Sequence, residues 1–194
     1  ANALRNKNGQ SIEEHMQDTG ELFESFSKVA SKNEYAWFPT HRSAAEIAEV
    51  KPENRMIGLP YTKYMNSIMR VNQSCAMVMM SAKKARELGV TESKWIFMYS
   101  GACLNDIWNV SDRVDYHSSP AIKACTDSVF DLANTSINHI DFIDLYSCFP
   151  SAVQIAMKEL SLEPNDPRGL TVTGGLPYFG GPGNAYVCLL YTSD

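Results

Sequence analysis

Apolar side chains recur at helical spacing in several parts of the chain. The longest pattern, Ser11 to Ala30, begins with a capping box formed by Ser11 and Glu14, and Gly20 predicts an interruption within it. Three further helices are predicted: Ser81 to Leu88, closed by Gly89; a helix that starts at Pro120 after Ser119; and Pro150 to Leu160. A shorter one is expected near Ala44–Ala48.

Short apolar runs lie between these helices and have the composition of buried strands. The runs are Cys75–Met80, Trp95–Ser100, Phe142–Tyr146 and Leu170–Thr173. Alternation of strands and helices indicates an α/β layered fold, so we expect the four runs to form one mixed β-sheet with helices on its faces. Residues 1–70 are expected to be a loop or cover region with helical segments, and the layered fold is expected to begin at residue 71.

Composition excludes several classes of function. The 194 residues are 44% apolar and carry 17 Lys and Arg against 22 Asp and Glu, a net charge of -5 with no basic block, so nucleic acid is not an expected partner. The longest uncharged run, Leu170–Ser193, contains glycines and prolines that would break a membrane-spanning helix, so no membrane span is predicted.

Cysteines and histidines give no sign of a metal site or a disulfide framework. The five cysteines form no C-x-x-C pair and are odd in number, which is typical of reduced thiols in the cytoplasm or a similar compartment. No two of the four histidines have metal-ligand spacing, and no cofactor is predicted.

The first candidate for chemistry is Tyr146-Ser147-Cys148. It follows a predicted strand and precedes the helix that Pro150 opens, a place where ligands bind in open α/β sheets. The N–H groups of a helix start would stabilise a thiolate at Cys148, whereas Asp144 would oppose it if it lay close. The alternative is that Cys148 is a small buried apolar residue.

The second candidate is the glycine-rich segment 174–184. Its glycines allow positive φ angles and a close approach to a ligand, although a structural turn would also use them. The segment lacks the spacing of a phosphate-binding loop. His117 precedes the helix at Pro120 and either faces a pocket or is an ordinary loop histidine.

Three segments resemble a known family in the right order. Ile143-Asp-Leu-Tyr-Ser-Cys-Phe149 resembles the Glu-Leu-His-Asp-Cys-Phe motif of sterol-carrier-protein-linked and archaeal thiolases. Val71–Ser81 resembles the Asn-Asp-Gly-Ala-Ala-Ala-Val stretch, and Thr173–Asn184 resembles the Gly-His-Pro loop. The chain is therefore identified as similar to the divergent thiolase-like branch labelled acetyl-CoA acetyltransferase.

This resemblance implies a site and a ligand. It implies catalytic roles for Tyr146, Ser147 and Cys148, and substrate binding by Gly180, Gly181, Gly183, Asn184 and His117. The ligand would be an acyl-CoA thioester and the full-length protein a homo-oligomer. Tyr146 and Ser147 stand where the family has Asn or His and an acidic residue, and Gly181 stands where it has His, which we expect to leave room at that position.

The resemblance also implies that residues 71–187 are part of the C-terminal half of a thiolase. The half with the nucleophilic cysteine would be absent, so we expect this segment alone to be inactive. Residues Cys188–Asp194 resemble a translated sequencing adapter, and we exclude them from the functional predictions.

Two functions remain open at this point. The protein is either an acyl-CoA acyltransferase or a catalytically degenerate thiolase-like protein that binds acyl-CoA or scaffolds a partner. In either case we expect residues 146–148 to lie within contact distance of Gly180–Asn184.

Overall fold

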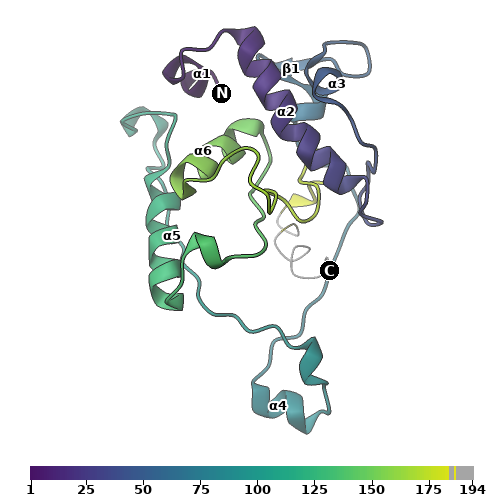
Figure 1. Ribbon diagram of the computed structural model, residues 1–194, viewed down its shortest axis with the longest axis vertical. Coiled ribbons are helices and arrows are strands. Elements are labelled where there is room, and N and C mark those ends of the chain that lie inside the picture. The colour runs from purple at the N-terminus through teal and green to yellow at the C-terminus, as the bar shows by residue number, and fades with distance from the viewer. Residues whose placement is uncertain (184–185, 187–194) are drawn as a thin grey trace.

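The computed structural model describes residues 1–183 and 186 of the chain (Figure 1). Its α-helices are α1 (Asn2–Lys7), α2 (Ile12–Ala30), α3 (Ala44–Ala48), α4 (Ala82–Glu87), α5 (Pro120–Ala133) and α6 (Pro150–Leu160). Strands β1 (Met56–Gly58) and β2 (Tyr61–Thr62) pair antiparallel. Short 3₁₀ turns are η1 (Lys63–Met65), η2 (Glu92–Lys94), η3 (Val110–Asp112) and η4 (Ile137–His139). Asn184 and the proposed adapter-derived segment Cys188–Asp194 lie outside the described residues.

The predicted helices are confirmed, with one correction in α2. The Ser11–Glu14 capping box is present, but α2 continues through Gly20 without a break. Glycine is needed there for packing rather than for a bend, because a Cβ at position 20 would lie 2.7 Å from the carbonyl oxygen of Ala44 in α3. The glycine therefore lets the two helices approach closely.

The predicted four-stranded sheet is wrong for the described residues. Cys75–Met80, Trp95–Ser100, Phe142–Tyr146 and Leu170–Thr173 are not strands in the structure, and β1 and β2 form the sheet that is present. The last two segments still lie side by side, joined by the backbone bond from Leu145 N to Leu170 O at 3.0 Å. A strand requires a hydrogen-bonding neighbour along its length, and residues 1–183 and 186 do not supply one.

The apolar core joins segments on both sides of residue 70. Helix α2 contributes Phe23 and Phe26, both fully buried, and the later part of the chain contributes Val153 of α6 and the aromatic rings of Tyr178 and Phe179. Phe23 packs against Phe26 with ring centroids 5.2 Å apart and meets Tyr178 edge to face. The N-terminal residues are thus part of the core.

Most of residues 69–118 lies outside this core, apart from Cys75, which packs against it, and Gln73, which donates a hydrogen bond to Phe179 O. Figure 1 shows α4 at the end of the molecule away from α1–α3, connected by two long segments without regular structure. Within this extension Ala85 is the one buried residue, and large apolar side chains such as Val78 and Phe97 are exposed. The extension therefore contributes little to the hydrophobic core.

Candidate functional site

The segment Phe142–Cys148 keeps the alternation of a strand although it is unpaired along most of its length. Ile143, Leu145 and Ser147 are buried, whereas Tyr146 is 58% exposed and Cys148 is half-buried. Tyr146 and Cys148 therefore share one face, and Ser147 points to the opposite, interior face. The structure separates the three candidate residues into an outward pair and an inward one.

Ser147 fixes the start of the glycine-rich segment. Its hydroxyl oxygen accepts a hydrogen bond of 3.0 Å from Leu176 N. A Cβ at Gly175 would lie 2.6 Å from this oxygen and 2.6 Å from a ring carbon of Phe26, and the φ of Gly175 is 74°. Glycine is thus required at position 175 by both space and conformation. Ser147 holds the start of the glycine-rich segment in place through its hydrogen bond to Leu176 N.

Asp144 holds the same segment from the other side. One carboxylate oxygen accepts hydrogen bonds from Val172 N at 2.9 Å and from the Thr171 hydroxyl at 3.1 Å. Burial nevertheless raises the pKa of Asp144, because these hydrogen bonds only partly replace the lost hydration. Asp144 positions residues 171–174 and is not a partner of Cys148.

Cys148 is not activated as a nucleophile by its surroundings. It precedes α6, but burial raises the pKa of its thiol above the ordinary value. The N–H group of Phe149 at the helix start lowers the pKa of this thiol, as expected, but the desolvation of the thiolate by burial is larger and sets the net direction. Burial also raises the pKa of the Tyr146 phenol. Both groups stay protonated at neutral pH and present S–H and O–H donors.

Tyr61 is a neighbour that the sequence did not reveal. Its hydroxyl oxygen accepts a 3.0 Å hydrogen bond from Ser151 N in the first turn of α6. Its ring stacks on Phe149, with centroids 6.1 Å apart and planes 10° from parallel. Tyr61 thus fixes the helix start that follows Cys148. No motif marks it, because its role depends on a contact between distant parts of the chain.

The glycine-rich segment departs from expectation at position 181. Gly180 and Gly183 have φ angles of 131° and 63°, which favour glycine. Gly181 lies outside that region of φ, and a Cβ there would clash with the Ser67 hydroxyl. The expectation of free room at 181 is therefore wrong, because Ser67 fills the space.

The backbone of Gly181 is also engaged. Gly181 N donates a hydrogen bond of 2.9 Å to Ile68 O. This N–H group cannot at the same time stabilise a ligand oxygen. Gly180 N donates to no acceptor within residues 1–183 and 186, but Gly180 is buried and the side-chain amide of Gln73 lies against it.

The segment Ser67–Ile68 forms hydrogen bonds to both candidate regions. Ser67 N donates to Cys148 O at 3.1 Å, and Ile68 N donates to Leu176 O at 3.2 Å. The described hydrogen bonds join residues 146–148 to Leu176 directly, through Ser147, but reach Gly181 through Ser67 and Ile68. The candidate site thus has three segments instead of two.

His117 lies apart from this cluster. The backbone N–H of His117 donates a hydrogen bond to the Asp115 carboxylate, which holds the pKa of Asp115 below its usual range, and His117 Nδ1 lies 3.4 Å from the same carboxylate. No hydrogen bond within residues 1–183 and 186 connects His117 to the other candidate residues.

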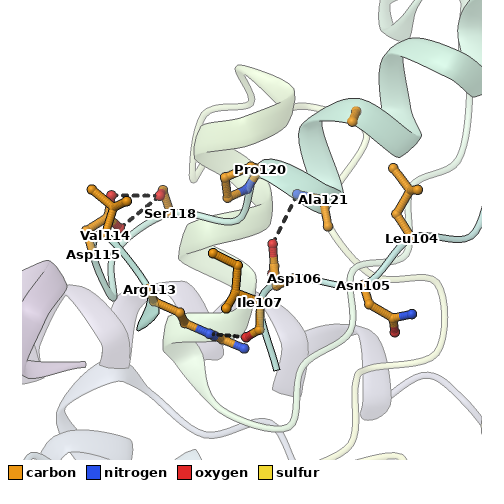
Figure 2. Close-up of a pocket in the computed structure, with 11 residues that line it drawn as sticks. Leu104, Asn105, Asp106, Ile107, Arg113, Val114, Asp115, Ser118, Pro120 and Ala121 are labelled. Atoms are coloured by element: carbon orange, nitrogen blue, oxygen red, sulfur yellow. Dashed lines mark hydrogen bonds between the residues drawn. The ribbon is translucent and has the colours of Figure 1, made fainter. Parts of the chain in front are cut away.

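A pocket of about 350 Å³ lies at the start of α5 (Figure 2). Pro120 and Ala121 line it, and Figure 2 shows Asp106 accepting a hydrogen bond from Ala121 N, at 3.1 Å. His117 and residues 146–148 are not among its lining residues. The Asp106 carboxylate also accepts from the Ser119 hydroxyl at 2.5 Å, so its two oxygens serve the helix start.

In the part of the chain that the structure describes, no group of three or more His, Cys, Asp or Glu residues could hold a metal ion. None of the helices described is both long and apolar enough to cross a bilayer.

Comparison with known proteins shows similarity to solved structures. No protein-family model and no curated protein matches the chain. The crystal structure of a monomeric SCP2-thiolase-like protein type 1 from Mycobacterium smegmatis superimposes with a TM-score of 0.89 at 37% sequence identity, over 99% of this chain. The chain is thiolase-like in sequence and fold. It spans 42% of the length of the mycobacterial protein.

This similarity supports an incomplete α/β fold of the thiolase-like kind. The expected homo-oligomer gains no support from it, because the mycobacterial thiolase-like protein is monomeric. Activity and ligand remain proposals.

Proposed function

We propose that this thiolase-like protein acts on CoA thioesters as an acyltransferase and that the present segment supplies the donors that polarise the thioester carbonyl. The supporting observation is the pair Tyr146 and Cys148, which share one face beside the N-terminus of α6. Burial raises the pKa of each group, so both are hydrogen-bond donors at neutral pH.

Such a site favours addition to a carbonyl. When a thiolate attacks the thioester carbon, a carbon–sulfur bond forms and the carbonyl oxygen gains negative charge. Donors already directed at that oxygen stabilise the charge without reorganising. Collapse then breaks the bond to the CoA sulfur, which leaves as a thiol after taking up a proton. We assign the attacking thiolate to a part of the protein outside these 194 residues, because the described cysteine at the site is kept neutral.

A second function, binding of acyl-CoA without turnover, is favoured by position 181. Gly181 has no side chain that could transfer a proton, and the Ser67 hydroxyl occupies the place where one would lie. Loss of a general acid or base typically lowers a rate about a hundredfold or more. Turnover, if the protein is an enzyme, should therefore be slow.

Assay of the full-length natural protein for acetoacetyl-CoA thiolysis distinguishes these functions. We expect slow turnover, well below the roughly 10 per second of an ordinary enzyme, and a further decrease in Cys148→Ala and Tyr146→Phe. Cys125→Ala, which changes a half-buried cysteine of α5, is the matched control and should have no effect. Saturable acyl-CoA binding without turnover would establish the second function. Ordinary turnover that neither site substitution changes would exclude the proposed site.

A further inference from the structure

The structure places a hydroxyl in the candidate site that no motif indicated. A Cβ at Gly181 would overlap the Ser67 hydroxyl oxygen and would lie 3.3 Å from Ile68 O and 3.5 Å from Leu176 Cβ. The φ of Gly181 is not in the left-handed region, so the backbone conformation does not require glycine. Glycine at 181 is instead required by the space that Ser67 takes.

Backbone hydrogen bonds on three sides hold Ser67 at this place. Ser67 N donates to Cys148 O, Ile68 N donates to Leu176 O, and Gly181 N donates to Ile68 O, at 3.1, 3.2 and 2.9 Å. The serine is thus fixed between the segment that carries Cys148 and the loop that carries Gly180. A donor on a fixed backbone loses little entropy when it binds a ligand.

The Ser67 hydroxyl makes no hydrogen bond to residues 1–183 or 186, and the residue is half-buried. Two other hydroxyls nearby are less accessible, since Ser147 is fully buried and Tyr61 is buried as well.

We propose that Ser67 is a ligand-binding residue of the CoA-thioester site and donates its hydroxyl proton to the thioester carbonyl oxygen. The inference rests on the proposed function and names one contact within it. The serine would supply, from residues that lie far earlier in the chain, a polar group that position 181 lacks. A single neutral hydrogen bond of this kind corresponds to about a five- to tenfold change in affinity.

Calorimetric titration of the full-length protein with acetyl-CoA and with CoA tests the contact. Only acetyl-CoA has the carbonyl, so Ser67→Ala should weaken acetyl-CoA binding about five- to tenfold and leave CoA binding unchanged. Ser74→Ala, an exposed serine on the same segment, is the matched control and should bind both ligands as the unaltered protein does.

The outcomes separate the two proposals. If the unaltered protein binds neither acetyl-CoA nor CoA, the proposed function is wrong. If it binds both, and Ser67→Ala weakens both equally or neither, only the assignment of Ser67 is overturned. The close contact between Ser67 and Gly181 can be tested separately. Gly181→Ala should lower the unfolding temperature, and adding Ser67→Gly should recover part of that loss. Absence of recovery would show that Ser67 does not fill the space at 181.

Discussion

The core around α2 and the extension 69–118 both contain large apolar side chains, but these side chains are buried in the core and exposed in the extension. In the core, Phe23 and Phe26 of α2 are fully buried against Tyr178 and its neighbours. In the extension, Phe97 is 62% exposed and Val78 is 81% exposed. The difference lies in the partners available, because an apolar side chain stabilises a fold only where another surface covers it.

This comparison explains why helices formed and predicted strands did not. A helix closes its hydrogen bonds within its own segment, so α4 forms even in the extension, capped by Ser81 and followed by Gly89. A strand needs a second segment alongside. The runs 75–80 and 95–100 have no such ladder among the described residues and remain irregular.

The largest expected difference in stability is between substitutions of two phenylalanines, one in the core and one in the extension. Phe23→Ala should lower the free energy of unfolding by about 3–5 kcal/mol, because it leaves a cavity in a packed core. Phe97→Ala should change it by less than about 0.5 kcal/mol, since its ring is largely exposed. Chemical denaturation measures both, and equal losses would show that the extension is packed as tightly as the core.

The next effect concerns two glycines. Gly20→Ala places a methyl group 2.7 Å from Ala44 O and should cost about 1–3 kcal/mol by overpacking, despite the better helix propensity of alanine. Gly101→Ala in the extension meets no atom within 4 Å and has an ordinary φ, so it should be nearly neutral. Thermal unfolding distinguishes them. A neutral Gly20→Ala would mean that α2 and α3 are not in close contact.

A pH effect should follow from His15. It is fully buried in α2, neither ring nitrogen has a partner within the described residues, and burial lowers its pKa below 6.5. The unfolded chain therefore binds the proton more tightly, so stability is complete above about pH 6.5 and is lost as the pH falls below it, by up to about 1.4 kcal/mol per pH unit.

His15→Leu should flatten this acid response, as denaturation measured between about pH 7 and pH 5 would show. His139→Gln, at an exposed histidine, should retain it. If both variants lose stability in acid as the unaltered protein does, His15 is not the group responsible.

The smallest effect concerns two tyrosine hydroxyls. Tyr61→Phe removes the acceptor of Ser151 N at the start of α6 and should cost about 1 kcal/mol. Tyr116→Phe removes a bond to Val110 O in the exposed extension and should cost almost nothing, because water replaces the partner. Denaturant midpoints provide the measurement, and the reverse order would contradict the assignment of the core.

Sequence patterns predicted the local features and missed the distant contacts. The capping box of Ser11 with Glu14 and the start of α5 at Ser119-Pro120 depend on neighbouring residues and are confirmed. The interruption predicted at Gly20 is wrong, because glycine is needed there for the close contact with Ala44 of α3, which the local sequence does not reveal.

The same limit applies to the candidate site. Tyr146, Ser147 and Cys148 stood out by their position before a helix, but the inward orientation of Ser147 depends on contacts with Gly175 and Leu176. Ser67 meets Gly181 only after folding, and no spacing in the sequence relates them.

The central claim is that a CoA thioester binds among residues 67–68, 146–148 and 176–183. Hydrogen–deuterium exchange on the full-length protein, with and without saturating acetyl-CoA, tests it directly. Slower exchange is predicted at the amides of these three segments, with unchanged exchange at 77–80 and 96–99 in the extension. Protection confined to the pocket at the start of α5, around Asp106 and Ala121, would contradict the account and place the ligand there.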